Sequence, residues 1–364
     1  MNLNTLSIKE ARDKLQKKEI SARELTESCL SAIKEKDPKI NSFLTVCEKE
    51  ARDAADSADK TIKAGAHGSL TGIPFSLKDV FVTKGIRTTA SSKVLDGYIP
   101  QYDATVYARL KKEGAILLGK TNCDAWGHGS STENSDYGAT KNPWNTEYVP
   151  GGSSGGSAAS VAADLNFFSI GGDTGGSIRQ PAAFCNMVGL KVTYGRVSRY
   201  GAIAFASSLD TVGPITKTVT DAAIVLSAIA GRDVYDATTP DVEVPDYENL
   251  LKNAPKKCRI GLPKEFFAEG IDKEVKECVL NAAKTLEKLG HSIEEVSIPA
   301  VPYAVACYYL VAPAETSSNL ARFDGIRYGD ARGVFGDEAK RRIMIGTYAL
   351  SSGYYDAYYA KGQK

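Results

Sequence analysis

Two short segments rich in glycine and serine hold the residues of this chain that are most able to do chemistry. Residues 151–157 read GGSSGGS, residues 171–177 read GGDTGGS, and an apolar segment upstream of both ends in Lys78. Lys78, Ser153 and Ser177 can act as a base, a proton relay and a nucleophile, which together transfer acyl groups without histidine. The pattern therefore predicts a Ser-Ser-Lys site for acyl transfer.

The proton chemistry of such a site explains why these residue types are needed. A serine hydroxyl must lose its proton as it attacks, and a lysine can take that proton only when the lysine is neutral. Burial lowers the pKa of a lysine, and Lys78 ends an apolar segment. Ser153 would pass the proton from Ser177 to Lys78 and later return it to the leaving amine.

The second segment also predicts a binding place for negative charge. Backbone N–H groups of Thr174, Gly175 and Gly176 precede an expected helix, which is the arrangement of an oxyanion hole. Asp173 and Arg179 flank Ser177, and we expect them to form an ion pair that holds the loop rather than to carry protons.

Each of these features has an ordinary alternative. Glycine- and serine-rich segments are often linkers, and glycine loops before helices often bind phosphate. Taken alone, Lys78 could be a strand-end lysine, Ser177 a helix cap and Ser153 a turn residue. The context favours a site, because residues 158–163 predict a closely packed helix and residues 165–170 a buried strand. Neither segment has the lysine of a P-loop or the G-x-G-x-x-G spacing.

The three histidines do not favour a Ser-His-Asp mechanism. His67 and His291 lie in predicted surface turns. Only His128 falls near the predicted site, where it could contact substrate, but the lysine already supplies a base.

The remaining sequence predicts an α/β enzyme. Ser7 with Glu10 and Ser21 with Glu24 are capping boxes that open two amphipathic helices. Strands and helices then alternate along the chain. The predicted segments are helices at 51–64, 105–113 and 273–289, strands at 73–80, 115–118, 259–262 and 291–296, and a surface connection at 232–257.

Composition is that of an ordinary globular enzyme. The 364 residues include 45 Lys and Arg against 44 Asp and Glu, so no overall basic field attracts nucleic acid. Seven cysteines without C-x-x-C spacing indicate a reducing, cytoplasmic setting and no metal site. The N-terminus is too charged for a cleavable signal, and three prolines interrupt the apolar stretch 296–314, so we expect no membrane span.

At residues 150–160, 171–201 and 210–222 the chain resembles the amidase signature family. The resemblance implies an α/β fold with a mixed, mostly parallel central sheet flanked by helices on both faces. It implies an N-terminal helical segment, 1–65, and a catalytic domain, 66–364. It also implies Ser177 as nucleophile, Ser153 as relay behind a cis peptide with Gly152, and Lys78 as base.

Residues 129–145, 308–329 and 341–359 resemble the glutaminase subunits of tRNA-dependent amidotransferases within that family. This implies that glutamine is hydrolysed to supply ammonia, which converts misacylated Glu-tRNA(Gln) to Gln-tRNA(Gln). The implied partners are the B and C subunits of a heterotrimer; ATP and Mg²⁺ are used by a partner, which also holds most of the tRNA, and this chain holds no cofactor. A free-standing amidase for small amides and a catalytically impaired scaffold subunit remain alternatives.

The same resemblance implies Ser130, Tyr309 and Arg342 as glutamine-binding residues. The neighbouring Tyr308 and Arg341 fit the motif as well, and core packing or a solvated helix face are alternative roles. The family continues beyond residue 364 and has a longer insertion where this chain has residues 329–333, so we expect the catalytic domain to be incomplete at the C-terminus.

Overall fold

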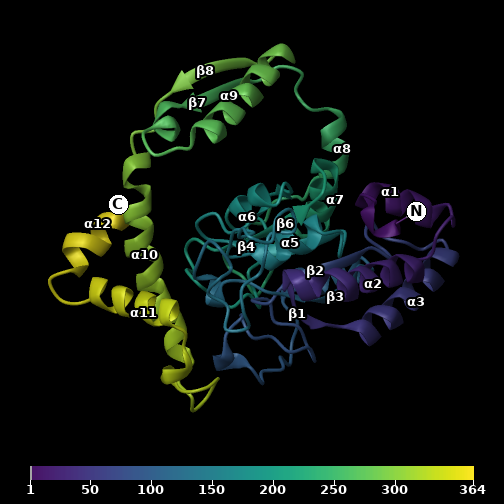
Figure 1. Cartoon of the computed structure of the whole chain (residues 1–364), viewed down its shortest axis with the longest axis horizontal. Coiled ribbons are helices and arrows are strands. Elements are labelled where there is room, and N and C mark those ends of the chain that lie inside the picture. The colour runs from purple at the N-terminus through teal and green to yellow at the C-terminus, as the bar shows by residue number, and fades with distance from the viewer. Residues whose placement is uncertain (1) are drawn as a thin grey trace.

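A six-stranded sheet forms the centre of the structure, a computed structural model that describes residues 2–364 (Figure 1). In spatial order its strands are β1 (Phe43–Val46), β3 (Ile116–Thr121), β2 (Pro74–Lys78), β4 (Phe168–Asp173), β6 (Thr211–Thr216) and β5 (Val188–Gly189). Strand β2 pairs in parallel with β3 and β4, whereas the β1–β3, β4–β6 and β5–β6 pairs are antiparallel. Four strands, β3, β2, β4 and β5, thus share one direction, and β1 and β6 run the other way.

Helices cover both faces of this sheet. They are α1 (Ile8–Gln16), α2 (Ala22–Ile40), α3 (Glu48–Lys63), α4 (Thr105–Lys112), α5 (Gly155–Ala162), α6 (Arg179–Phe184), α7 (Val219–Ile229) and α8 (Tyr247–Lys252). Side chains alternate along β2, so Ser76 faces Ser160 of α5 while Phe75 packs near Tyr107 of α4 on the opposite face. The predicted α/β fold with flanking helices is confirmed.

Close packing puts α5 directly over the central strands. All residues of α5 except Ala162 are buried. A Cβ at Gly156 would lie 2.7 Å from the carbonyl oxygen of Ser42, so only glycine fits at this helix position. The small side chains of this helix therefore let the residues before it, including Ser153, approach the end of β2.

Several local predictions are confirmed at the N-terminus and beyond. Both capping boxes are present, Ser7 with Glu10 and Ser21 with Glu24. The connection predicted at 232–257 contains one element that was not expected from the sequence, the short helix α8. Among residues 2–364, every helix is too short or too polar to cross a bilayer.

A second, smaller sheet lies apart from the first, at the top of Figure 1. The β7–α9–β8 unit comprises β7 (Arg259–Pro263), α9 (Lys273–Lys288) and β8 (Ser292–Val296), and its two strands pair in parallel. None of its helix or strand residues is buried.

The C-terminal arm consists of α10 (Ala304–Asn319), α11 (Asp337–Ala349) and α12 (Ala360–Gln363), which pack on one another at the left of Figure 1. The end of α10 reaches the loop before β6. There the Glu315 carboxylate accepts the N–H of Ser208 at 2.9 Å, and Asn319 Nδ2 donates to the carbonyl of Phe205 at 3.1 Å. The arm therefore closes one side of the region around the predicted site.

Candidate active site

Lys78, the last residue of β2, is buried beneath the loop that leads into α5. Only 2 % of its surface is exposed. Its Nζ donates to Ser153 Oγ at 2.7 Å and to Ser154 Oγ at 3.0 Å. Burial lowers the pKa of the Lys78 ammonium, which favours the neutral form that a base requires. Although Lys78 ends a strand, its side chain is buried and does not extend into solvent.

Ser154 joins the two glycine-rich segments, a role that was not expected from the sequence. Its Oγ donates to the carbonyl of Gly172 at 3.1 Å, and its N–H donates to the carbonyl of Ser177 at 3.2 Å. A hydroxyl has one proton, so Ser154 can only accept from Lys78. The lone pair of a neutral Lys78 is then left for the Ser153 proton. Adjacent serines in a GGSSGG segment look equivalent until their partners are known.

Ser177 lies at the end of the second segment, where it is 8 % exposed. Its backbone carbonyl is tied to Ser154, which brings the two loops together. In the described part of the chain no hydrogen bond links the hydroxyls of Ser153 and Ser177. Catalytic hydrogen bonds often close only when substrate is bound, and the nucleophilic role of Ser177 stays a prediction.

Asp173 organises the loop before Ser177. Its carboxylate forms the expected ion pair with Arg179, which is bidentate with distances of 2.9 and 3.0 Å. It also accepts the N–H of Gly176 at 2.8 Å and that of Ile178 at 3.1 Å. Helix α6 begins only at Arg179, because Asp173 takes up the amides before it.

The predicted oxyanion hole therefore needs a correction. The N–H of Gly176 already points at Asp173, so it is not free to bind an oxyanion in this structure. The N–H groups of Thr174 and Gly175 have no protein acceptor within residues 2–364. Two of the three predicted donors, Thr174 and Gly175, remain available.

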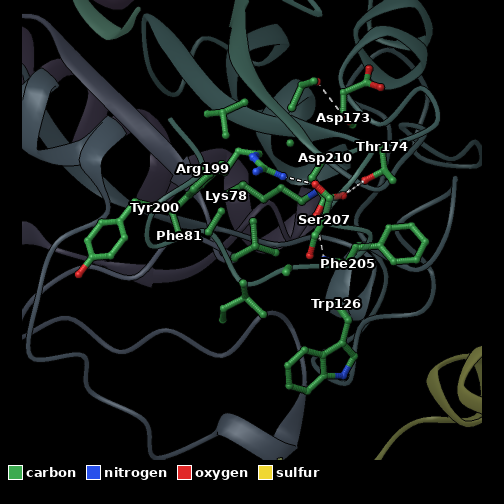
Figure 2. Close-up of a pocket in the computed structure, with 18 of the residues that line it drawn as sticks. Lys78, Phe81, Trp126, Asp173, Thr174, Arg199, Tyr200, Phe205, Ser207 and Asp210 are labelled. Carbon is green, nitrogen blue, oxygen red and sulfur yellow. Dashed lines mark hydrogen bonds between the residues drawn. The ribbon is translucent and has the colours of Figure 1, made fainter. Parts of the chain in front are cut away.

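A cavity of about 240 Å³ opens above Lys78 and Ser153 (Figure 2). Its polar wall includes Thr174, whose hydroxyl donates to the Asp210 carboxylate at 2.6 Å. Ser177 does not itself line the cavity. The apolar walls come from Phe81, Trp126 and Phe205, with further lining by residues 199–200 and 202–204. The cavity can thus hold a small polar molecule against Lys78 and Ser153.

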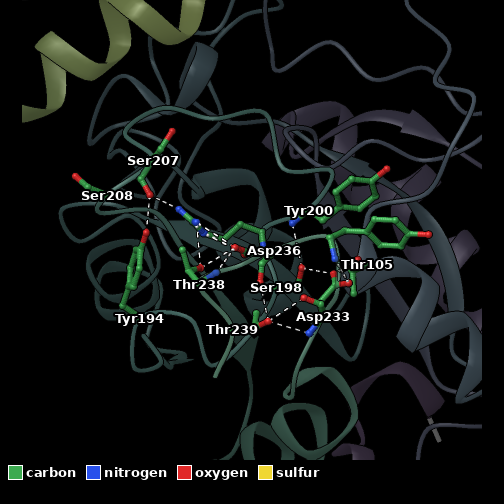
Figure 3. Close-up of polar contacts among 12 residues, drawn as sticks. Thr105, Tyr194, Ser198, Tyr200, Ser207, Ser208, Asp233, Asp236, Thr238 and Thr239 are labelled. Atoms are coloured by element: carbon green, nitrogen blue, oxygen red, sulfur yellow. Dashed lines mark hydrogen bonds and ion pairs between the residues drawn. The ribbon is translucent and has the colours of Figure 1, made fainter. Parts of the chain in front are cut away.

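A polar network holds residues 198–199, at the start of the segment that lines one side of that cavity (Figure 3). The Asp236 carboxylate accepts the backbone N–H of Arg199 at 2.9 Å and pairs with its guanidinium at 3.3 Å. Asp233 accepts the hydroxyls of Thr105 and Ser198. These aspartates lie in the stretch predicted as a surface connection, and its Asp-rich composition gave no sign of this role.

Of the residues implied for glutamine binding, Arg342 is buried and reaches toward the second loop. It is 5 % exposed, pairs with Glu338 at 2.8 Å, and its Nη1 donates to the Tyr308 hydroxyl at 3.4 Å. The Tyr308 ring lies against Gly175, where a Cβ would be 2.8 Å from Cε2. Tyr308 and Arg342 therefore stand next to the predicted oxyanion loop.

The other candidates point elsewhere. Arg341 is exposed and pairs with Glu338, and Tyr309, 46 % exposed, stacks its ring 5.2 Å from the Arg342 guanidinium. Ser130 is exposed, and its carbonyl accepts from Gln180 Nε2 at 2.9 Å. The structure thus places Tyr308, rather than the predicted Tyr309, against the loop.

His128 is a core residue. It is fully buried, its ring packs edge-on against Phe205, and Nε2 lies 3.4 Å from Thr316 Oγ1 of α10. Burial lowers the pKa of His128 to about 3, so the ring is neutral. His67 is exposed, as predicted, and His291 is half-buried. Among residues 2–364, no group of three or more His, Cys, Asp or Glu side chains could hold a metal ion.

Known proteins are similar to this chain in sequence and in fold. A sequence model of the family described as "Amidase" matches residues 24–364. The A subunit of glutamyl-tRNA(Gln) amidotransferase from Geotalea daltonii is 55% identical over 379 residues, covering 100% of this chain and 78% of the relative. The A subunit of the same name from Caldanaerobacter subterraneus subsp. tengcongensis is also 55% identical, with the same coverage. These alignments are longer than the 364 residues of the chain, so the relatives carry residues that this chain lacks.

Solved structures agree. The crystal structure of the A subunit of glutamyl-tRNA(Gln) amidotransferase from Thermotoga maritima matches with a TM-score of 0.82 and 43% identity, over 100% of this chain and 74% of the other. Native peptide amidase from Stenotrophomonas maltophilia matches with a TM-score of 0.83 and 30% identity, over 98% of this chain and 78% of the other. The family predicted from the glycine- and serine-rich motifs is confirmed, and the chain belongs to the amidase family.

Proposed function

We propose that this chain hydrolyses glutamine as the A subunit of a Glu-tRNA(Gln) amidotransferase. The observation that carries the proposal is the buried contact of 2.7 Å between Lys78 Nζ and Ser153 Oγ, beside the loop that ends in Ser177. Relatives that bear the name of this subunit, at 52% to 55% identity, support the choice of substrate.

Acylation begins when neutral Lys78 takes the proton of Ser153, which takes that of Ser177. The Ser177 Oγ then bonds to the carboxamide carbon of glutamine, and the carbonyl oxygen becomes an oxyanion. The N–H groups of Thr174 and Gly175, which have no protein acceptor within residues 2–364, would donate to that oxyanion.

Collapse of this intermediate returns the proton through Ser153 to the leaving nitrogen, and the C–N bond breaks to release ammonia. Water then attacks the γ-glutamyl ester on Ser177 by the same proton route and releases glutamate. Ammonia passes to a partner that uses ATP and Mg²⁺ to activate Glu-tRNA(Gln). We place this reaction in the cytoplasm, in a complex with B and C subunits, with catalysis assigned to residues 66–364.

A second candidate is a free-standing amidase for small amides. It is favoured by the likeness to peptide amidase, and to a bacterial aryl acylamidase at 30% identity with a TM-score of 0.85. The two candidates differ in whether glutamine turnover depends on partner subunits.

The test uses the whole chain, alone and purified with B and C subunits, and measures ammonia release from glutamine and from a simple aryl amide. We expect glutamine turnover to rise strongly with the partners. A fluorophosphonate probe should label wild-type protein at Ser177, and Ser177→Ala should lose labelling and turnover, whereas Ser57→Ala, at an exposed position in α3, should keep both. Labelling at Ser153 would overturn the roles. Glutamine turnover absent in every preparation, with brisk aryl amide hydrolysis, would favour the second candidate.

A further inference from the structure

A buried carboxylate that the mechanism above does not use lies beside the Lys78–Ser153 pair. Asp124 follows β3 by three residues and is fully buried. Its backbone N–H donates to the carbonyl of Ser153 at 3.2 Å. Its Oδ2 accepts the N–H of Thr132 at 2.9 Å, and its Oδ1 accepts that of Asn134 at 3.2 Å. Asp124 thus ties the relay serine to the loop 131–134.

Two glycines pack directly on this carboxylate. A Cβ at Gly152, the residue before Ser153, would collide with Asp124 Oδ2, and a Cβ at Gly129 would collide with the Asp124 carboxyl carbon. The absence of side chains at these positions lets both loops close around the charge. The position of Ser153 is therefore set in part by a carboxylate that touches its neighbour.

Charge balance around Lys78 separates Asp124 from the other acids. The carboxylates of Asp124, Asp173 and Asp210 each raise the pKa of Lys78. Asp173 has its own cation, Arg179, at 2.9 Å, and Arg199 is the cation that acts on Asp210.

Asp124 has no such cation. Within residues 2–364 it forms no ion pair, and Lys78 is the cation that opposes the rise which burial causes in the pKa of Asp124. The thiol of Cys123 also faces Lys78, but burial raises its pKa to about 12, so it carries no charge at neutral pH. Among the carboxylates that act on Lys78, Asp124 is therefore the one without a cation of its own in the described part of the chain.

We propose that Asp124 is a positioning residue for the proposed acyl-transfer reaction: its carboxylate holds Gly152 and the loop 131–134 so that Ser153 stays against Lys78, and its charge faces the ammonium that Lys78 becomes when it accepts the proton. This inference rests on the proposed function, because it gives Asp124 a role only if Lys78 is the base.

The charge of Asp124 opposes the effect of burial on the pKa of Lys78. A negative charge favours the protonated ammonium, so Asp124 raises the pKa of Lys78 against the effect of burial. Without that charge the pKa of Lys78 falls further, and more of the lysine is neutral at a given pH. The acid limb of the rate profile should then move to lower pH.

The experiment replaces Asp124 by Asn in the full chain and follows the rate of fluorophosphonate labelling at Ser177 from pH 5 to pH 10. We expect the acid limb to move down by about 0.5 to 1 pH unit. The plateau rate should fall by roughly 10-fold to 100-fold, because an amide cannot accept N–H bonds at both of its ends and Ser153 loses its support. Asp221→Asn is the matched control, a buried aspartate at α7 that should change neither value.

A second variant tests the same role with the charge kept. Gly129→Ala should push the carboxylate away from Gly152 and lower the plateau rate, even if Asp124→Asn fails to fold. An acid limb that stays in place or moves up in folded Asp124→Asn would overturn the proposal, as would a wild-type plateau in Gly129→Ala. Lys78→Met distinguishes failure of the Asp124 inference from failure of the proposed function. Labelling at the wild-type rate in Lys78→Met would refute the proposed function itself.

Discussion

Two regions of the described chain pair parallel strands that are connected through helices, and the regions differ in burial. In the first, β2, β4 and the intervening β3 and α5 are buried along nearly their whole length. In the second, β7, α9 and β8 contribute no buried residue. Only the first can hold an uncharged lysine, because a pKa falls through loss of water and not through secondary structure. Burial, rather than topology, makes the site.

Charged pairs show the same contrast. Lys120 of β3 and Asp79, the residue that follows β2, form an ion pair at 3.0 Å with side chains 0% and 1% exposed. Arg259 and Glu294 pair across β7 and β8 at 2.8 Å with side chains 81% and 45% exposed. The buried pair is enclosed by further bonds from Lys120 to the carbonyl of Phe81 and to Thr88, whereas the exposed pair meets water.

The largest effect should come from the buried lysine itself. Lys78→Met keeps the apolar stem but removes the amine that contacts Ser153, so we expect kcat/KM for amide hydrolysis to fall by about 10³-fold, the scale of general base catalysis. Lys273→Met, at an 89% exposed position in α9, should leave kcat/KM unchanged. Steady-state kinetics with circular dichroism to check folding measures both. Similar losses in the two variants would remove the distinction between the regions.

Breaking one charged pair in each region should lower the free energy of unfolding by different amounts. Lys120→Met leaves the Asp79 carboxylate buried without its cation, which should cost about 3 to 5 kcal/mol of unfolding free energy. Arg259→Met should cost much less, because its pair is exposed to solvent. Urea unfolding curves give both values. Equal costs would show that the exposed pair is enclosed in solution.

Burial of His128 should make the stability of the protein sensitive to acid. The pKa of His128 is lowered by burial to about 3, so the unfolded chain binds a proton that the folded chain refuses. The resulting stability is fully present above about pH 6.5 and is lost as the pH falls below that value, by up to about 1.4 kcal/mol per unit. Comparing unfolding of wild type and His128→Asn at pH 7.5 and 5.5 isolates this contribution. A wild type that loses no more stability than His128→Asn on acidification would contradict it.

The smallest expected effect is a single methylene in each sheet. Ile170→Val in β4, where the side chain is fully buried, should lower the unfolding free energy by about 1 kcal/mol. Ile293→Val in β8 is only half-buried and should cost less than about 0.5 kcal/mol. Urea midpoints at constant slope report the difference. A larger cost in β8 would mean that the second sheet is covered by other protein in solution.

Much of the region around the six-stranded sheet could be predicted from the sequence, because its local sequence signals agree with its packing. The capping boxes at Ser7 and Ser21 are where capping chemistry places them, and the strand predicted at 73–80 is β2, which spans 74–78. Spacing also brought Lys78 and Ser153 together, since the motif puts the loop before α5 over the end of β2. The same signals predicted α9 correctly but could not say what it packs against, because amphipathic patterning is silent about partners.

The parts that were missed depend on long-range partners. Ser154 is set apart from Ser153 by its bonds to Gly172 and Ser177, and the Gly176 amide is not free for the expected oxyanion hole because Asp173 accepts it. The sequence placed His128 near the predicted site, in a glycine-rich segment, but did not show that α10 packs over it with Thr316. Such choices between neighbouring hydrogen-bond partners are settled by tertiary contacts.

The central claim is that a neutral, buried Lys78 drives attack by Ser177 through Ser153. The most direct test is the rate of fluorophosphonate attachment to Ser177 as a function of pH, in the wild type and in Lys78→Met. We expect the wild type to show an acid limb whose midpoint lies below 10.5, the ordinary pKa of lysine, and we expect Lys78→Met to lose it. A midpoint at the ordinary lysine value, or an unchanged profile in Lys78→Met, would contradict it.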